Sequence, residues 1–273
     1  MRSIAKLMKD WQFTGPDGVT TAVELPHTWN ARDGQDGGND YWRGCCTYCT
    51  RFAAPVYDPA QQQVWLQFEG VNASATVLLN GQQLCTHDGG YSTFRAEVTE
   101  LLQAENQLTV RVDNSVNDRV YPQKADFTFY GGIYRDVSLL VVNKDHIALG
   151  HFGDTGVKIT PALQENSADI QVETLVEGSG TVTVELLDAE GRTAAKGEGE
   201  NAFLHLDAPH LWNGVKDPYL YTCVVRLLQD GQPVDEVTTR VGLRSFSVDA
   251  MCAACPSSCS PSAPARRKAR RPA

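Results

Sequence analysis

Hydrophobic and polar residues alternate along most of this chain with a period of two. The alternation is clearest in four stretches, at residues 64–68, 108–112, 170–172 and 182–186. Successive side chains of a β-strand point to opposite faces, so each stretch predicts a strand with one buried face and one wet face. No stretch shows the 3.6-residue period of a long amphipathic helix. The pattern therefore predicts an all-β protein.

Short turn signals separate the predicted strands. Asn80-Gly81 and Asp230-Gly231 each lie between two apolar runs, and such pairs tolerate the positive φ values of a tight hairpin. Gly131-Gly132 is predicted to bend the chain so that Ile133 can enter a strand. Short strands with regular turns and without helices favour sandwiches or barrels.

The chain is expected to divide near residues 143–156. A strand at 137–142 is followed by Asn143-Lys144-Asp145 and then by a glycine-rich run. We expect a first sandwich at 1–145 and a second at 146–249, whose length suits an immunoglobulin-like domain. Residues 250–273 contain few large apolar side chains and are expected to be disordered. Their composition favours out-of-frame translation of a GC-rich gene over the alternative, a functional basic tail.

The charge and hydropathy of the chain exclude several functions. The net charge is -9, which argues against nucleic acid as a partner because phosphate binding needs a basic surface. The N-terminus lacks the apolar core of a signal peptide. No stretch approaches the ~18 apolar residues that a membrane span needs. These features predict a cytoplasmic protein without a membrane partner.

Eight cysteines raise the question of a metal site. Cys46/Cys49 and Cys252/Cys255 have the spacing of zinc ligands. The first pair is predicted to lie in a strand, where positions three apart face opposite sides. The second pair has no histidine or further pair to complete a site. We therefore expect reduced structural thiols, and neither a metal nor another cofactor.

Six local motifs, in order over residues 25–248, together resemble glycoside hydrolase family 2, the β-galactosidase and β-glucuronidase group. They are Leu25-Pro26-His27-Thr28-Trp29-Asn30, Asp40-Tyr41-Trp42-Arg43-Gly44, the run from Phe68 to Phe94, Gly131-Gly132-Ile133-Tyr134-Arg135-Asp136-Val137, Leu211-Trp212 with Pro218-Tyr219-Leu220-Tyr221, and Val241-Gly242-Leu243-Arg244. The resemblance implies a jelly-roll (galactose-binding-like) sandwich followed by an immunoglobulin-like sandwich.

In complete members of that family a catalytic (β/α)₈ barrel follows, and its reaction is retaining hydrolysis of a β-glycoside by two glutamates. The resemblance thus implies that this chain is the non-catalytic N-terminal portion of a β-galactosidase-like enzyme, ending before the barrel. Alone it is expected to be inactive. Its implied partners are a carbohydrate, of the β-galactoside or β-glucuronide type, and the barrel of the same gene product.

The resemblance also singles out two residues as sugar contacts that would complete the site of the barrel. Asp126 stands six residues before the second glycine of the Gly-Gly-Ile motif, and Asn39 lies in the loop before Tyr41. A carboxylate suits this task because it accepts hydrogen bonds from sugar hydroxyls; the alternative for Asp126 is a solvated loop residue. No residue is predicted to be catalytic, and His87 is expected to hydrogen-bond within its own loop.

Four aromatic residues could stack on sugars, namely Trp29, Tyr41, Trp42 and Tyr91. We expect them in the core instead, because aromatic residues of sandwiches are usually buried. Two other functions remain open from the sequence. The chain could be a stand-alone carbohydrate-binding module, or a structural protein whose sandwiches cover another subunit.

Overall fold

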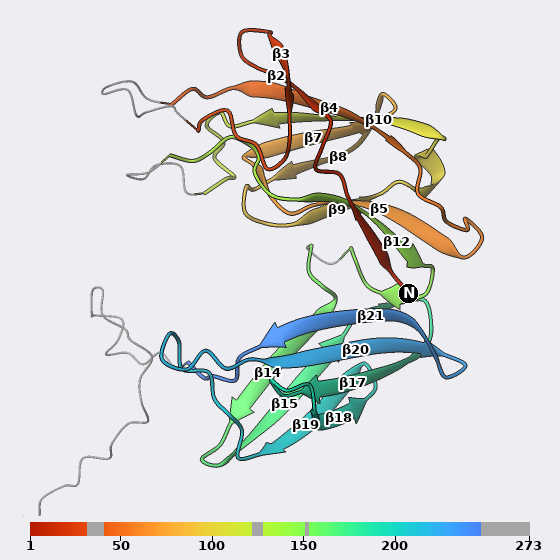
Figure 1. Cartoon of the computed structure of the whole chain (residues 1–273), viewed down its shortest axis with the longest axis vertical. Coiled ribbons are helices and arrows are strands. Elements are labelled where there is room, and N and C mark those ends of the chain that lie inside the picture. The colour runs from red at the N-terminus through yellow and green to blue at the C-terminus, as the bar shows by residue number, and fades with distance from the viewer. Residues whose placement is uncertain (32–40, 122–127, 151–152, 247–273) are drawn as a thin grey trace, which may run out of the picture. The chain divides into compact units, whose positions relative to one another are not determined.

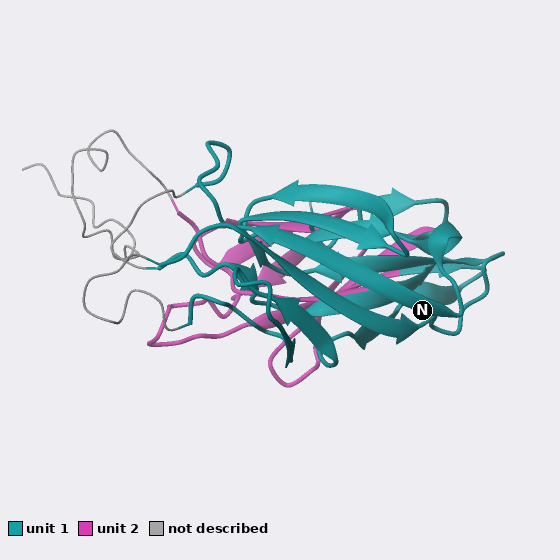
Figure 2. Cartoon of the chain, turned by 90° about the horizontal axis from the view of Figure 1, so that it is seen from above, with its two compact units in different colours: residues 1–156, 175–180, 227–236 teal, residues 157–174, 181–226, 237–273 magenta. Residues whose placement is uncertain are grey.

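A computed structural model describes residues 1–31, 41–121, 128–150 and 153–246 of the chain. These residues form two compact units, distinguished by colour in Figure 2. Unit 1 comprises residues 1–156, 175–180 and 227–236, and unit 2 comprises the rest. The C-terminal segment expected to be disordered, residues 250–273, lies outside the described residues.

Unit 1 contains two antiparallel sheets, which lie one above the other in Figure 1. The smaller sheet has the order β1 (Ser3–Lys6), β12 (Val137–Asn143), β5 (Gln62–Phe68) and β9 (Phe94–Glu97). The larger has the order β3 (Thr20–Val23), β2 (Trp11–Thr14), β4 (Cys45–Ala53), β10 (Glu105–Asp113), β7 (Ser74–Leu79) and β8 (Gln82–Asp88). The inward faces of both sheets share one apolar core. This arrangement is a β-sandwich.

The predicted alternation accounts for the core of unit 1. Val64, Leu66 and Phe68 of β5 are fully buried, and the residues between them are half-buried. In β10 the buried apolar face comprises Leu108, Val110 and Val112. Strand β12 departs from this pattern because it is buried on both faces. Leu140 and Val142 form its second apolar contact, with Leu149 and Trp65.

The predicted turns of unit 1 are confirmed. β7 ends at Leu79 and β8 begins at Gln82, and Asn80 and Gly81 between them have φ of 52° and 84°. Gly132 opens the short strand β11 (Gly132–Ile133) with φ of 133°. β11 pairs with β6 (Val71–Asn72). A further short pair joins β13 (His146–Ile147) to β16 (Val176–Glu177).

The remaining strands form two further sheets. One is three-stranded, in the order β14 (Val157–Leu163), β15 (Ser167–Thr174) and β19 (Asn201–Asp207). The other has the order β18 (Thr193–Glu198), β17 (Thr181–Leu187), β20 (Tyr221–Gln229) and β21 (Gln232–Val241). The predicted inward residues of β15 and β17 are buried. Asp230 and Gly231 form the expected turn between β20 and β21, with positive φ.

Strands dominate the described parts of the chain. Within residues 1–31, 41–121, 128–150 and 153–246, the single helical element is the 3₁₀ turn η1 (Thr99–Leu101). The prediction of an all-β fold is confirmed.

Candidate functional site

The two predicted sugar contacts lie outside the described residues. Asn39 belongs to the stretch 32–40 and Asp126 to the stretch 122–127. The residues that flank these stretches are described, and they lie at the same end of the unit 1 sandwich (Figure 1). The candidate site is therefore built from the side chains at the bases of the two segments.

A buried asparagine ties these flanking segments together. Asn30 is 1% exposed. Its Oδ1 accepts hydrogen bonds from the Gly131 amide at 2.7 Å and from Asn114 Nδ2 at 3.1 Å. Its Nδ2 donates to the Trp42 carbonyl at 3.0 Å. One side chain thus joins the chain before residues 32–40, the chain after them, and the chain after residues 122–127.

Two more buried amides extend this network from the strands. Asn114 directly follows β10, and its Oδ1 accepts from the Gly44 amide at 2.8 Å. Asn72 of β6 donates to the Tyr130 carbonyl at 2.9 Å. Buried polar groups need such partners, since an unsatisfied one costs about 1–3 kcal/mol. The bases of both segments are therefore held by side chains that project from the sheets.

The three asparagines were not singled out by sequence reasoning. Asn30 and Asn72 lie inside motifs that resemble the family, and Asn114 ends an alternating stretch. A polar residue at the end of a strand is usually exposed, so only the fold shows that these three are buried.

Replacing Asn114 with leucine, which has nearly the same shape, is expected to cost about 2 kcal/mol of folding free energy. The change leaves the Gly44 amide and the Trp42 carbonyl without this partner. Urea unfolding measures the loss. The matched control is Asn201→Leu in β19, where the amide oxygen makes an exposed hydrogen bond to Gln171. A similar loss in both variants would mean that the network contributes little.

A small cavity adjoins the network. Its lining includes Arg43, Asn72, Tyr91, Asn114 and Phe129. Its volume is about 20 Å³, which accommodates about one water molecule and no sugar ring. No aspartate or glutamate lines it. This cavity therefore lacks the two carboxylates that retaining hydrolysis requires.

The rim of this end is aromatic and open. Tyr91 is 51% exposed and Tyr121 is 76% exposed. The expectation that Trp42 and Tyr91 belong to the core is wrong, because both lie in connecting segments, where the strand alternation does not direct side chains inward. Trp29 is half-buried and stacks on Phe13 with centroids 6.0 Å apart. Tyr41 is half-buried beneath the Arg43 guanidinium.

Two histidines of unit 1 are half-buried. His27 Nδ1 lies 2.8 Å from Tyr48 Oη, and burial lowers the pKa of His27 and raises that of Tyr48. His87 stacks on Phe94 at 4.3 Å, and its Nε2 lies 3.1 Å from Ser92 Oγ. His87 lies in β8 and not in a turn as expected, but it does contact the loop that follows, through Ser92.

His87 provides a pH-dependent prediction. Burial lowers its pKa below 6.5, because the imidazolium ion loses hydration. The unfolded chain keeps the ordinary value, so it binds more protons, and His87 makes the fold less stable as the pH falls through about 6.5. NMR titration should find the pKa of His87 below 6.5. His205 is the internal control, since hydrogen bonding to Asp169 raises its pKa. Equal midpoints for the two rings would contradict the prediction.

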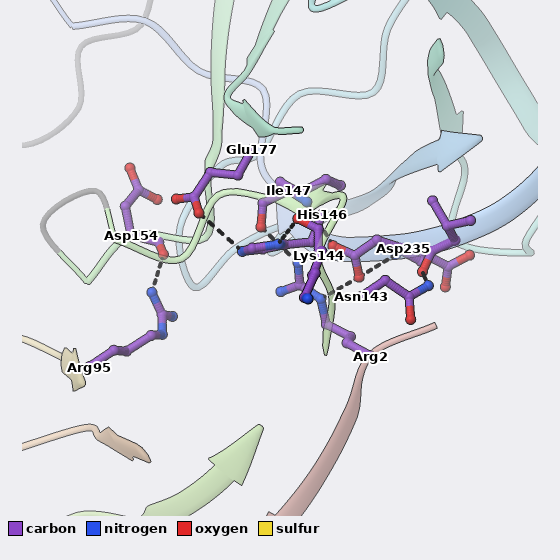
Figure 3. Close-up of polar contacts among 11 residues, drawn as sticks. Arg2, Arg95, Asn143, Lys144, His146, Ile147, Asp154, Glu177 and Asp235 are labelled. Carbon is purple, nitrogen blue, oxygen red and sulfur yellow. Dashed lines mark hydrogen bonds and ion pairs between the residues drawn. The ribbon is translucent and has the colours of Figure 1, made fainter. Parts of the chain in front are cut away.

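A second concentration of polar groups lies in unit 1 around Asp235 (Figure 3). Its carboxylate is fully buried and accepts from Arg2 Nε at 2.7 Å, from Arg2 Nη2, and from the Ile147 amide at 2.8 Å. His146, also fully buried, lies 3.5 Å from a carboxylate oxygen of Glu177. Arg2 and Ile147 supply the donors around Asp235, so this cluster joins the residue before β1 to β13 and β21 and leaves no open position for chemistry.

The described residues contain no group of three or more histidine, cysteine, aspartate or glutamate side chains that could hold a metal ion. Cys46 is buried and Cys49 half-buried in β4, on opposite faces as the strand geometry predicts. In the described part of the chain, no helix is long and apolar enough to cross a membrane.

Comparison with known proteins agrees with this architecture. Residues 151–244 match the profile of Glycosyl hydrolases family 2. Residues 38–162 match that of the Glycosyl hydrolase 2 galactose-binding domain-like family. This chain belongs to glycosyl hydrolase family 2.

Individual relatives are considerably longer. A β-glucuronidase from Bacteroides fragilis is 32% identical over 266 residues, which cover 89% of this chain and 38% of that protein. A β-galactosidase from Bacteroides ovatus is 32% identical over 282 residues, covering 88% of this chain and 31% of that protein. The crystal structure of an FMN-binding β-glucuronidase from Faecalibacterium prausnitzii L2-6 superimposes with a TM-score of 0.84 at 36% identity. The superposition covers 91% of this chain and 40% of the Faecalibacterium chain. The chain thus corresponds to less than half of each relative.

Proposed function

We propose that this chain is the non-catalytic front part of a retaining β-glycosidase that acts on β-glucuronides or β-galactosides. The observation that carries the proposal is the extent of two matches. A β-glucuronidase and a β-galactosidase each match nearly all of this chain, and the chain covers less than half of either enzyme. The cavity at the loop end offers no carboxylate pair. The two catalytic carboxylates, which retaining hydrolysis holds ~5–5.5 Å apart, then belong to the polypeptide that follows in the relatives.

In this proposal, residues 32–40 and 122–127 present Asn39 and Asp126 to the sugar. The buried network of Asn30, Asn72 and Asn114 supports the idea, since it fixes the bases of both segments to the sheets. A site is more effective when the supporting shell is rigid. Asp126 would accept hydrogen bonds from sugar hydroxyls, and Asn39 would donate to or accept from them.

A fusion enzyme tests this function. Residues 1–249 are joined to the part of the Bacteroides fragilis β-glucuronidase that follows its matched stretch. Hydrolysis of 4-nitrophenyl β-D-glucuronide and 4-nitrophenyl β-D-galactoside is then measured. We expect activity on one of them from the fusion and none from the chain alone. Loss of a hydrogen bond to a charged group costs about 1.5–3 kcal/mol, so Asp126→Asn should raise KM at least about tenfold.

The matched control is Asp118→Asn, which removes the charge of an exposed aspartate in the segment that follows β10. We expect its KM to stay within about twofold of the unaltered fusion. An Asp126→Asn variant with the same KM as the control would refute the sugar contact. A stable fusion inactive on both substrates would refute the glycosidase function.

A second candidate is a stand-alone carbohydrate-binding module. The exposed tyrosines at the rim favour it, because sugars stack on open aromatic faces. Calorimetry of the full chain with millimolar glucuronate or galactose decides: saturable heat that Tyr91→Ala and Tyr121→Ala remove would support the module, and flat heat would exclude it.

We also propose a cytoplasmic location. The five described cysteines are all free thiols, which suits a reducing compartment. Fractionation of cells that produce the chain from its native gene tests this location; recovery outside the cytoplasm would refute it.

A further inference from the structure

A cavity of unit 1 lies where strand β8 passes through a loop into strand β9. Its volume is about 400 Å³, which falls in the range of about 300–1,000 Å³ that is usual for ligand pockets. It shares no lining residue with the small cavity beside the asparagine network. Its lining includes four polar side chains and two apolar ones, namely His87, Ser92, Thr93, Arg95, Phe94 and Leu149. The cavity is therefore large enough to hold a small molecule.

Arg95 in β9 brings a half-buried positive charge to this cavity. Its Nε donates to Gln67 Oε1 at 2.7 Å. Its Nη1 donates to the carbonyls of Leu149 at 2.8 Å and of Asp154 at 2.6 Å. Figure 3 shows Arg95 directed at this carbonyl oxygen of Asp154. All three acceptors are uncharged, and in the described part of the chain no carboxylate lies within the 4.0 Å of an ion pair with Arg95.

The surroundings of Arg95 disfavour its charge. Burial is the main factor that lowers the pKa of Arg95, because the guanidinium ion loses hydration, and the charge of Arg2 lowers it further. The carboxylates of Asp154 and Glu69 oppose this effect, but more weakly. A charge that is removed from water is normally paired, since its lost hydration is otherwise not compensated. A bound anion would restore this pairing.

The donors around the cavity come singly from separate side chains. Nε and Nη1 of Arg95 are engaged, which leaves Nη2 without a hydrogen-bond partner among the described residues. The best grip on a planar carboxylate needs parallel N–H groups from two guanidinium nitrogens, and Arg95 has only one nitrogen to offer. The Thr93 hydroxyl likewise has no partner in the described part of the chain. Single donors of this kind suit a phosphate group, which presents three acceptor oxygens in different directions.

His87 holds Ser92 at the same cavity. The imidazole stacks on Phe94, with ring centroids 4.3 Å apart and an interplanar angle of 17°. Its Nε2 lies 3.1 Å from Ser92 Oγ. In the tautomer that carries the proton on Nε2, the imidazole donates to Oγ, and the exposed Ser92 hydroxyl keeps its own proton for another acceptor. Ser92 is thus a hydroxyl donor that is held in place before any ligand binds.

We propose that this cavity binds a phosphate group, either as free phosphate or as the monoester of a small molecule. Arg95 supplies the positive charge, and the hydroxyls of Ser92 and Thr93 donate to phosphate oxygens. The volume of about 400 Å³ leaves room beyond the phosphate for the remainder of a small monoester. The inference is independent of the proposed function, because every residue that carries it lies in unit 1 and no glycoside takes part.

Isothermal titration calorimetry tests the binding on the full 273-residue chain. Sodium phosphate, phenyl phosphate and sodium acetate are titrated separately at neutral pH and constant ionic strength, in a buffer without phosphate. We expect one-to-one saturation by at least one of the two phosphates, with a Kd of about 1 mM or below. Acetate should bind at least about tenfold more weakly. Tighter binding of phenyl phosphate would identify the monoester as the ligand, and tighter or equal binding of phosphate would identify the free ion.

Two variants locate the bound phosphate. Arg95→Gln should raise its Kd at least about tenfold, because the positive charge is lost. Ser92→Ala removes one hydroxyl and should raise the Kd about threefold or more. Ser92→Ala keeps the test decisive if Arg95→Gln unfolds the chain, since the exposed Ser92 side chain bonds only with His87 among the described residues.

The matched controls are Arg51→Gln in β4 and Ser3→Ala in β1, where both side chains are exposed and outside the cavity. Each should keep the Kd within about twofold of the unaltered chain. Far-UV circular dichroism of all four variants checks that the fold is intact.

Imidazole NMR signals give a readout that needs no variant. Saturation with phosphate should shift the signals of His87, which lines the cavity, and leave those of His205 in unit 2 unchanged. Equal shifts of the two rings would overturn the proposal. So would any of three calorimetric results: no saturable binding of either phosphate, acetate binding as tight as that of the phosphates, or binding that Arg95→Gln and Ser92→Ala weaken no more than their controls.

Discussion

Replacing Gly132 with alanine is expected to cost about 4 kcal/mol or more of folding free energy. Gly132 has φ of 133°, a conformation that residues with a Cβ adopt only with strain of about 1–3 kcal/mol. The added Cβ would also lie 2.5 Å from the His27 carbonyl oxygen and 2.8 Å from Tyr48 Oη. The first of these is a backbone atom, which cannot rotate away. Overpacking of this kind adds about 1–3 kcal/mol.

The loss should be visible in urea unfolding, or as a missing folded population at 25 °C. Gly81→Ala separates the two causes. Gly81 has φ of 84°, and nothing lies within 4 Å of the position of its added Cβ. It should lose only the strain, about 1–2 kcal/mol. Equal losses at the two positions would show that the strands β6 and β11 shift to absorb the clash.

The Asp235→Asn substitution is expected to destabilise the protein by about 3 kcal/mol. The buried carboxylate neutralises Arg2, whose side chain is only 15% exposed, and it accepts the Ile147 amide. After the substitution, the guanidinium is left without its counter-charge. The side-chain NH2 group of the new asparagine would also lie against an N–H donor, either from Arg2 or from the Ile147 amide. Removing one partner of a buried pair typically costs about 3–5 kcal/mol, and asparagine retains one of the acceptor oxygens.

An exposed ion pair is the control for this substitution. Glu173 pairs with Lys158 at 2.7 Å, with the two side chains 41% and 69% exposed. Glu173→Gln should change stability by less than about 1 kcal/mol, because solvent screens the pair. Thermal unfolding of both variants at neutral pH makes the comparison. If Asp235→Asn were as mild as the control, Arg2 would have a different counter-ion in solution.

Much of the fold follows from local sequence signals. The alternation in β5, β10, β15 and β17 predicts which side chains are buried, because a strand has a fixed period of two. The hairpins at Asn80-Gly81 and Asp230-Gly231 depend on backbone preferences of two adjacent residues. The double burial of β12 gives no alternating signal, since its second apolar contact comes from Leu149 and Trp65.

The candidate site was less predictable because its residues, like the second face of β12, are surrounded by distant segments. Asn39 and Asp126 were predicted from resemblance to a family, and both remain predictions because they lie outside the described residues. Tyr91 and Trp42 were expected inside and are exposed. Aromatic residues are buried by neighbouring layers rather than by their own local pattern, and connecting segments have no such layer.

The sequence by itself determined the strand class, the hairpin turns and the family, because each depends on residues close together or on motifs in order. Only the tertiary structure decided which polar residues are buried. Asn30 bonds to Asn114, 84 positions away, and Arg2 bonds to Asp235, 233 positions away. A polar side chain carries no periodic signal of its own burial. Its environment depends on which distant segments the fold brings around it, and on whether they supply the hydrogen-bond partners that burial requires.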